Sequence, residues 1–196
     1  MELCVFQGTF NPIHNAHIDI AEYALKHFAK DGIIFIPAYK PPHKTSVDNM
    51  SIHRLNMVKL AVGYNPKFYV SDIEYKRSGK SYTYLTILQL YEIYKPTNKI
   101  KFIIGTDAFK QIETWYETDK LKNLVDFFVF PRENNFDSDE LKLFESKGYS
   151  YTVLPHAYND ISSTKLRDYI KQGMSLSNLV PNKVEEYIKK YDLYKD

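Results

Sequence analysis

Short runs of apolar residues recur along the chain, and each is followed by a polar turn and then by a stretch with helical spacing. The runs at residues 3–6, 33–36, 68–70, 100–104, 126–130 and 151–154 predict strands. Several of them are continuously apolar rather than alternating with polar residues, which is typical of strands that are covered on both faces. The pattern therefore predicts buried strands at the centre of a layered structure.

Helical spacing fills the segments between these strands. Apolar residues three and four positions apart form one face between His17 and Phe28. The same spacing follows Ser51, a candidate N-cap, and recurs from Thr83 to Tyr94. This alternation of strands and helices predicts a doubly wound α/β fold with a parallel sheet and right-handed crossovers.

The last part of the chain has a different pattern. A helix is expected from Ser162 to about Lys171, then a loop through Gly173 and Pro181, then a second helix to Tyr191. These two helices predict a small C-terminal helical element. The length of 196 residues fits a single domain, 1–196, and no repeat or linker divides it.

Composition narrows the class of protein. The formal net charge of +2 is too balanced for a protein whose main partner is nucleic acid. Cys4 is the only cysteine, which excludes a disulfide within the chain and a cysteine-based zinc site. The sequence also lacks a leader-like or membrane-spanning apolar run, so we expect a cytoplasmic protein without a membrane partner. Whether it is a monomer or a homo-oligomer stays open.

The segment after the first strand, residues 7–17, is the first candidate for chemistry, because open α/β sheets bind ligands beyond the carboxyl ends of their strands. This segment lacks the G-x-G-x-x-G dinucleotide pattern. Residues 79–81 resemble the end of a P-loop, but Glu74 stands where that loop requires glycine. Both common phosphate-binding loops are therefore excluded.

Two histidines, His14 and His17, stand where the first helix is expected to begin. Their spacing puts both imidazoles on one face near the helix N-terminus, where backbone N–H groups and the helix dipole favour an anion. As isolated histidines they are better explained by packing of the loop and the first turn. No further Cys, His or carboxylate is spaced to complete a zinc site with them.

Two motifs connect the chain to a known superfamily. Residues 8–17, Gly-Thr-Phe-Asn-Pro-Ile-His-Asn-Ala-His, resemble the nucleotide-binding signature of the H-x-G-H nucleotidyltransferases, a class shared with class I aminoacyl-tRNA synthetases. Residues 161–167, Ile-Ser-Ser-Thr-Lys-Leu-Arg, resemble the second phosphate-binding motif of that superfamily. Two motifs in the right order are far more specific than one. The resemblance implies a Rossmann-like core at 1–160 and a closing element at 161–196 that carries the second motif.

Further segments resemble the bacterial nicotinate-nucleotide adenylyltransferases, so that the resemblance covers essentially the whole chain. They stand at residues 41–44, 81–86, 105–107, 115–116 and 180–188. Three positions depart from the usual pattern: Gln7 and Ala16 replace glycines and Asn11 replaces an aspartate. Related enzymes of the superfamily tolerate each departure, and neither histidine is lost.

The resemblance implies transfer of the adenylyl group of ATP to nicotinate mononucleotide, giving deamido-NAD and pyrophosphate in NAD biosynthesis. The attacking phosphate is already an anion near neutral pH, so positioning and charge neutralisation can carry the rate without a strong general base. Mg²⁺ would be bound through the ATP phosphates, with no metal ligand from the protein. ATP and nicotinate mononucleotide are thus the implied partners.

The resemblance also implies residue roles. The implied catalytic residues are His14 and His17. The implied ATP-binding residues are Gly8, Thr9, Phe10, His14, His17, Gly105, Asp107, Ile161, Ser162, Ser163, Thr164 and Arg167. The implied residues for the mononucleotide are Lys44, Thr83, Thr86, Trp115 and Tyr116.

Alternatives remain for several of these residues and for the substrate. Lys44 could be an isolated surface lysine, Asp107 a helix N-cap and Trp115 a core residue, whereas Arg132 is a candidate for the adenine pocket by position only. The acceptor could be nicotinamide mononucleotide or another phosphorylated compound such as phosphopantetheine. A non-catalytic nucleotide sensor or a tRNA-binding relative of the synthetases would require a more basic face than the net charge indicates.

Overall fold

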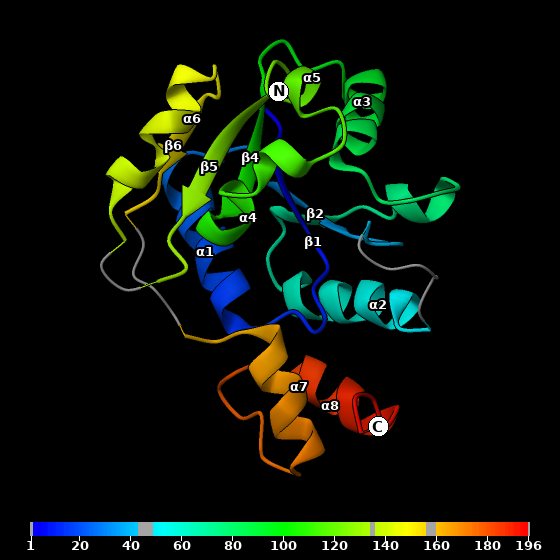
Figure 1. Ribbon diagram of the computed structural model, residues 1–196. Coiled ribbons are helices and arrows are strands. Elements are labelled where there is room, and N and C mark those ends of the chain that lie inside the picture. Colours follow the sequence, from blue (N-terminus) through cyan, green and yellow to red (C-terminus); the bar gives the residue numbers. More distant parts are fainter. Residues whose placement is uncertain (1, 43–48, 134–135, 156–159, 196) are drawn as a thin grey trace.

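A parallel sheet of six strands forms the centre of the structure, a computed structural model that describes residues 2–42, 49–133, 136–155 and 160–195 (Figure 1). The strands are β1 (Cys4–Gly8), β2 (Ile33–Pro37), β3 (Phe68–Val70), β4 (Ile100–Gly105), β5 (Val125–Phe130) and β6 (Tyr151–Val153). Their order is β3-β2-β1-β4-β5-β6, the Rossmann arrangement. The predicted fold class is confirmed, and each predicted strand lies within two residues of its observed bounds.

Five helices longer than two turns were expected from the spacing of apolar residues, and all five are present: α1 (Asn15–His27), α2 (Ser51–Val62), α3 (Thr83–Tyr94), α7 (Ser163–Lys171) and α8 (Asn182–Lys190). Shorter helices fill the loops: η1 (Ile73–Lys76), α4 (Thr106–Phe109), η2 (Ile112–Thr114), α5 (Thr118–Leu121), η3 (Ser138–Leu141) and α6 (Lys142–Ser146). The short helices escape sequence analysis because they have too few turns to show a periodic apolar face. Among the described residues, no helix combines the length and apolar character needed to cross a membrane.

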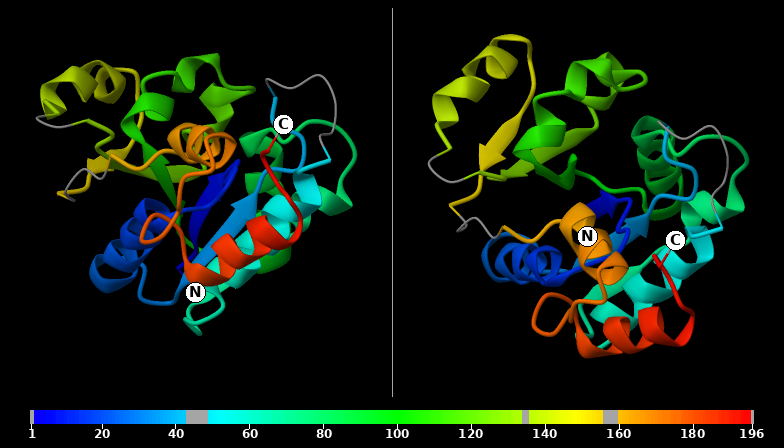
Figure 2. Two further views of the ribbon diagram at one scale, coloured as in Figure 1. Left: turned by 90° about the horizontal axis from the view of Figure 1, so that it is seen from below. Right: turned by 60° about the horizontal axis from the view of Figure 1, so that its bottom comes forward.

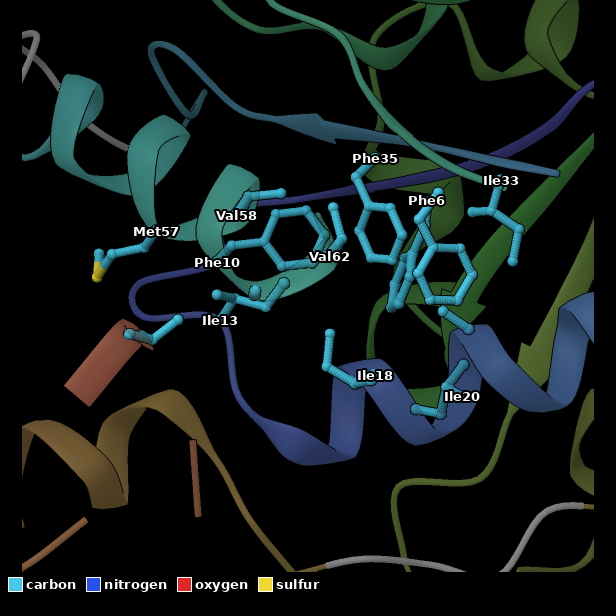
Figure 3. Close-up of a cluster of buried hydrophobic side chains, with 14 of the residues drawn as sticks. Phe6, Phe10, Ile13, Ile18, Ile20, Ile33, Phe35, Met57, Val58 and Val62 are labelled. Atoms are coloured by element: carbon cyan, nitrogen blue, oxygen red, sulfur yellow. The ribbon is translucent and has the colours of Figure 1, made fainter. Parts of the chain in front are cut away.

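The helices cover both faces of the sheet, which explains the continuous apolar runs of the strands. One core lies between the sheet and α1, α2, α7 and α8, and the other between the sheet and α3 to α6. In the first core, the rings of Phe6, Phe10 and Phe35 lie between α1 and α2 (Figure 3). Alternate residues of β1 serve the two cores, since Phe6 faces the first and Val5 the second.

The C-terminal helices return to the beginning of the chain. Helix α8 lies beside α2 in both views of Figure 2. The Tyr187 hydroxyl joins them, since it is 3.0 Å from Nδ1 of His53 and accepts a hydrogen bond from the Asn56 amide at 3.0 Å. The backbone N–H of Asn15, at the start of α1, donates to the carbonyl of Leu179. These contacts fix the last segment against the carboxyl edge of the sheet.

The two serines expected at helix starts behave differently. Ser162 is the N-cap of α7, with extended backbone and a hydroxyl that accepts from the N–H of Lys165 at 3.3 Å. Ser51 is not the N-cap that the sequence suggests, because Met50 before it already has helical backbone angles and occupies the cap position. Ser51 is therefore the first residue of α2, and its carbonyl accepts from the Tyr75 hydroxyl.

We predict that Ser162→Ala lowers the free energy of unfolding by about 0.5–1 kcal/mol, because a Ser-to-Ala change at an N-cap leaves a helix donor unpaired. The matched control is Ser51→Ala, which places a good helix former inside α2 and is expected to cost less. Urea unfolding of both variants measures the difference. Equal losses in the two variants would contradict the assignment of the caps.

Candidate active site

A cleft of about 630 Å³ opens at the carboxyl ends of β1 and β4, where the strand order reverses direction. Ligands of open α/β sheets bind at such a switch point. The cleft wall includes the predicted residues Gly8, Thr9, Phe10, His17, Thr83, Gly105, Asp107, Trp115, Ser163 and Arg167. Most of the predicted site is thus brought together from segments that are far apart in sequence.

Several predicted residues lie outside the wall of this cleft. They are His14, Thr86, Tyr116, Ile161, Ser162 and Thr164. Lys44 belongs to the segment outside the described residues. Conversely, the wall includes Gln7, Asn11 and Ser81, to which no role is assigned from the sequence, and Arg132, a candidate for the adenine pocket by position only.

The chain turns sharply after β1, and Phe10 makes the turn possible. Its φ of 48° lies in the left-handed region, which is uncommon for a residue other than glycine. Its ring is buried against Phe6 and His17, at centroid distances of 5.4 and 5.1 Å. A Cβ atom on Gly8 would come within 3.1 Å of the same ring. The side chain of Phe10 therefore anchors the β1–α1 loop (residues 9–14), and its backbone faces the cleft.

The rings of the two histidines lie close together at the start of α1, tilted by 33° to each other. Their ring centroids are 3.7 Å apart, and the His14 N–H donates to Nδ1 of His17 at 3.3 Å. Because Nδ1 of His17 accepts this bond, its proton resides on Nε2, which makes Nε2 a donor. His14 is fully buried, and neither of its ring nitrogens has a hydrogen-bond partner among the described residues. His17 is half-buried and lines the cleft, so the pair is suited to an anion that approaches from the cleft.

Burial keeps both imidazoles uncharged. It lowers the pKa of His14 from 6.5 to about 3, with a further contribution from the charge of Arg132. The pKa of His17 is also well below its usual value, through burial first and then through His14 and Arg132. A bound phosphate would oppose these effects, because a nearby negative charge favours the protonated form.

Helix α7 brings the second predicted motif to the β1–α1 loop. Arg167 donates from Nη1 to the carbonyl of Asn11 at 2.8 Å, and the Ser163 hydroxyl donates to the carbonyl of Pro12 at 2.9 Å. The Tyr194 hydroxyl donates to Oδ1 of Asn11 at 2.8 Å. A guanidinium has five N–H donors, so Arg167 keeps donors for an anion in the cleft.

The β4 side of the cleft carries a second cation. The guanidinium of Arg132 is 3.8 Å from a carboxylate oxygen of Asp107, and its backbone N–H donates to the Thr106 hydroxyl at 3.0 Å. A Cβ atom on Gly105 would come within 2.7 Å of the Asp107 carboxylate and 3.0 Å of the Arg132 side chain, so a larger residue would have to displace both side chains. Asp107 belongs to the first turn of α4 rather than capping it, because Gly105 is the N-cap.

The opposite end of the cleft is aromatic. Trp115 and Thr83 line it, and both also line an adjoining recess of about 70 Å³ to which Tyr116 contributes. The ring of Tyr116 stacks on that of Tyr82 at 4.6 Å. Tyr116 therefore lies beside the cleft, in the recess, rather than in the main wall.

A buried carboxylate lies behind this end. Glu74 accepts hydrogen bonds from the Gln7 amide at 2.6 Å, the Thr86 hydroxyl at 2.6 Å and the Tyr39 N–H at 3.2 Å. It is 2% exposed, and Thr86 is fully buried with its hydroxyl turned toward it. The side chain of Thr86 thus supports the wall from behind. The sequence gives no signal for this network, because its partners come from four separate segments.

The family comparison agrees with the fold and with the position of the two motifs. The model of the cytidylyltransferase-like family matches residues 5–169, so the chain belongs to this family of nucleotidyltransferases. A relative from Clostridium botulinum (strain Kyoto / Type A2), named "Probable nicotinate-nucleotide adenylyltransferase", is 39% identical over 97% of this chain and 98% of its own. A relative of the same name from Citrifermentans bemidjiense is 38% identical over 100% of this chain and 99% of its own. Within the broader family, the chain belongs to that of the nicotinate-nucleotide adenylyltransferases.

Solved structures show the same fold. The nicotinic acid mononucleotide adenylyltransferase of Plasmodium falciparum, complexed with NaAD, superposes with a TM-score of 0.81 and 24% identity, covering 98% of this chain and 97% of its own. A nicotinate-nucleotide adenylyltransferase structure from Vibrio parahaemolyticus, described as putative, superposes with a TM-score of 0.66 and 19% identity, covering 100% of this chain and 97% of its own. The Rossmann-like fold is therefore shared with these proteins.

We predict that His14 makes the protein less stable in acid. The unfolded chain binds a proton on this residue near pH 6.5, whereas the folded state does so only at about 3, so the free energy of unfolding falls as the pH drops through this window. His14→Gln removes this dependence. Thermal unfolding measured from about pH 7 to about pH 4 should therefore show a smaller loss of stability in this variant than in the parent. His27→Gln, an exposed position on α1, is the control and should keep the parent slope. Identical slopes in both variants would refute the assignment.

Proposed function

We propose that the protein transfers the adenylyl group of ATP to nicotinate mononucleotide, forming deamido-NAD and releasing pyrophosphate. The observation that carries this proposal is the close pair of His14 and His17 at the cleft that Arg167 lines, in which the ring nitrogens of His14 have no hydrogen-bond partner among the described residues. The names of its relatives and the fold it shares with them support the same activity.

The chemistry needs little proton transfer. A phosphate oxygen of the mononucleotide attacks the α-phosphorus of ATP, one P–O bond forms, and the bond to pyrophosphate breaks. The attacking oxygen is already anionic near neutral pH, so no base has to remove a proton. The protein contributes alignment of the two substrates and donors for the charge that builds on the transferred group.

The positions of the donors suggest how this charge is shared. His17 lines the cleft and carries its proton on Nε2, so we assign Nε2 as the donor to an oxygen of the attacked phosphate. His14 is deeper and supplies a second N–H to the same group. Arg167 and Ser163, at the start of α7, hold the β- and γ-phosphates, and the Arg167 charge stabilises the departing pyrophosphate. Backbone N–H groups of Thr9 and Phe10 complete the phosphate site.

The remaining residues divide between the two substrates. Gly105, Asp107 and Arg132, at the β4–β5 side, are assigned to adenosine, with Asp107 accepting from its ribose. Trp115 and Thr83 are assigned to the mononucleotide, whose pyridine ring stacks on Trp115. Lys44, Thr86 and Tyr116 keep their proposed roles at this end, where backbone N–H groups near Thr86 and Tyr116 meet the carboxylate. The N–H of Thr86 itself donates to the carbonyl of Tyr82 at 3.2 Å. Ile161, Ser162 and Thr164 lie at the start of α7 and are assigned to the ATP site. We assign α7 and the sheet core to one domain.

Mg²⁺ fits this site as a companion of ATP. The described residues include no cluster of three His, Cys, Asp or Glu side chains that could hold a metal ion by themselves. Histidine and arginine donors dominate the phosphate end, and they match phosphate oxygens rather than a cation. An ion held by the triphosphate and water would neutralise phosphate charge and needs no protein cage.

The proposed function is tested by the release of pyrophosphate from ATP with nicotinate mononucleotide, nicotinamide mononucleotide and phosphopantetheine as acceptors. We expect kcat/KM for the acid to exceed that for the amide by about tenfold or more, because backbone donors match a carboxylate but oppose an amide NH₂ group. His17→Ala should lower turnover with the acid by about tenfold to a hundredfold.

His27→Ala is the control for the histidine variant and should keep parental turnover, since it is exposed on the same helix. Full activity of His17→Ala and His14→Ala would show that the site is wrong. Preference for another acceptor would leave adenylyl transfer standing and change the substrate.

Arg167 is predicted to serve ATP. Arg167→Ala should raise the KM for ATP and lower turnover, with a smaller effect on the KM for the mononucleotide, because its charge lies with the leaving group. Arg167→Lys should recover activity only in part, since a lysine cannot form the bidentate contact. Steady-state kinetics with each substrate varied in turn, alongside Lys171→Ala as an exposed control on α7, measure these effects. A defect confined to the mononucleotide would reverse the assignment.

A further inference from the structure

Gln7 contributes an unused acceptor to the cleft. It occupies the penultimate position of β1 and is one of the residues that line the cleft. Its amide nitrogen donates to Oε1 of Glu74 at 2.6 Å. Its amide oxygen, Oε1, is buried and has no hydrogen-bond partner among the described residues. An acceptor left unpaired in the wall of a binding site costs free energy unless a ligand pairs with it.

The buried carboxylate of Glu74 determines which way the amide is turned. Ionised, it only accepts hydrogen bonds, so the Gln7 amide must present its NH₂ group to it. The opposite orientation would place the oxygen of Gln7 against that of Glu74 at 2.6 Å, which is repulsive. Glu74 is itself held by donors from Thr86 and Tyr39. The position of the free oxygen therefore follows from a rigid network rather than from a mobile side chain.

The position of Gln7 on the sheet indicates which substrate lies near this oxygen. Side chains alternate along β1, so Gln7 points to the same face as Val5, the face covered by α3 to α6. On that face Gln7 lies toward α3, because Glu74 joins it to Thr86 of α3. Trp115 packs against the core of that face, and Thr83 is the first residue of α3. Under the proposed function this is the mononucleotide end of the cleft. Asp107 and Arg132, assigned to adenosine, follow β4 and β5 instead.

The chemistry of the mononucleotide limits the group that can pair with Gln7. Near neutral pH the carboxylate and the phosphate of nicotinate mononucleotide accept hydrogen bonds and have essentially no proton to donate. Its ribose hydroxyls are the O–H donors that it offers. Resting on the proposed function, we propose that Oε1 of Gln7 accepts a hydrogen bond from a ribose hydroxyl of the mononucleotide, and that Gln7 is a further substrate-binding residue.

The test combines a protein variant with a substrate that lacks the donor. We compare kcat/KM of the parent and of Gln7→Met for nicotinate mononucleotide and for its 2′-deoxy and 3′-deoxy analogues. In the parent, one analogue should be used about tenfold less well than the full substrate. With the full substrate, kcat/KM of Gln7→Met should be about tenfold lower than that of the parent. With that same analogue, kcat/KM of the variant and of the parent should be nearly equal, because the hydrogen bond is already absent.

A second variant separates binding from folding. Gln7→Met removes a donor from Glu74 and can weaken the fold, whereas Gln7→Lys keeps a donor for Glu74 and has no acceptor. Both variants should lose the discrimination between the full substrate and the deoxy analogue. The KM for ATP should change less than the KM for the mononucleotide in either variant. A purely structural role of Gln7 would instead lower activity with every substrate by the same factor.

The outcomes distinguish this inference from the proposed function. If the parent transfers adenylyl groups to nicotinate mononucleotide but the losses from variant and analogue multiply, the Gln7 inference is wrong and the function stands. If the parent discriminates neither analogue, the inference is equally wrong. An effect of Gln7→Met confined to nicotinamide mononucleotide would assign the donor to its carboxamide and overturn the ribose contact. If the parent shows no transfer to nicotinate mononucleotide, the proposed function itself fails.

Discussion

The structure depends on holding two uncharged imidazoles at a helix start, where His14 is buried and His17 is half-buried. The ring nitrogens of His14 have no hydrogen-bond partner among the described residues, which opposes folding, and the surrounding contacts must compensate for it. The compensation comes from Phe10, whose ring fills the core beneath the loop, and from α7, which bonds to the carbonyls of Asn11 and Pro12. The loop is thus preorganised before any phosphate arrives, so little rearrangement is needed when charge develops.

Much of the fold follows from apolar spacing alone. The six strands and the five long helices show the expected periodicities, and parallel strands covered on both faces leave few alternatives to a doubly wound sheet. The meeting of the two phosphate motifs was also predictable by resemblance, because their residue types match. The cap of α2 was not, since Met50 has no capping side chain and nothing in the sequence separates it from Ser51.

The orientation of side chains in the site required the structure. Thr86 was expected at the mononucleotide, but its hydroxyl turns to Glu74, 12 residues earlier in the chain. In the sequence Gln7 is only a departure from a glycine, yet the same carboxylate, 67 residues away, accepts a hydrogen bond from its amide. Arg132 was a candidate by position, and only the structure brings it near Asp107. Long-range polar contacts of this kind have no periodic signal, because each joins one residue of one element to one of another.

The hydrogen bond from Tyr194 to Asn11 joins residues that are 183 positions apart. Together with the bonds from Ser163 and Arg167, it means that the loop after the first strand is completed by residues that are made long after it. During synthesis on a ribosome, the sheet core can assemble while the loop still lacks these partners. A nascent chain therefore has no finished phosphate site, and competence to handle nucleotides arises only on release of the C-terminal helices from the exit tunnel.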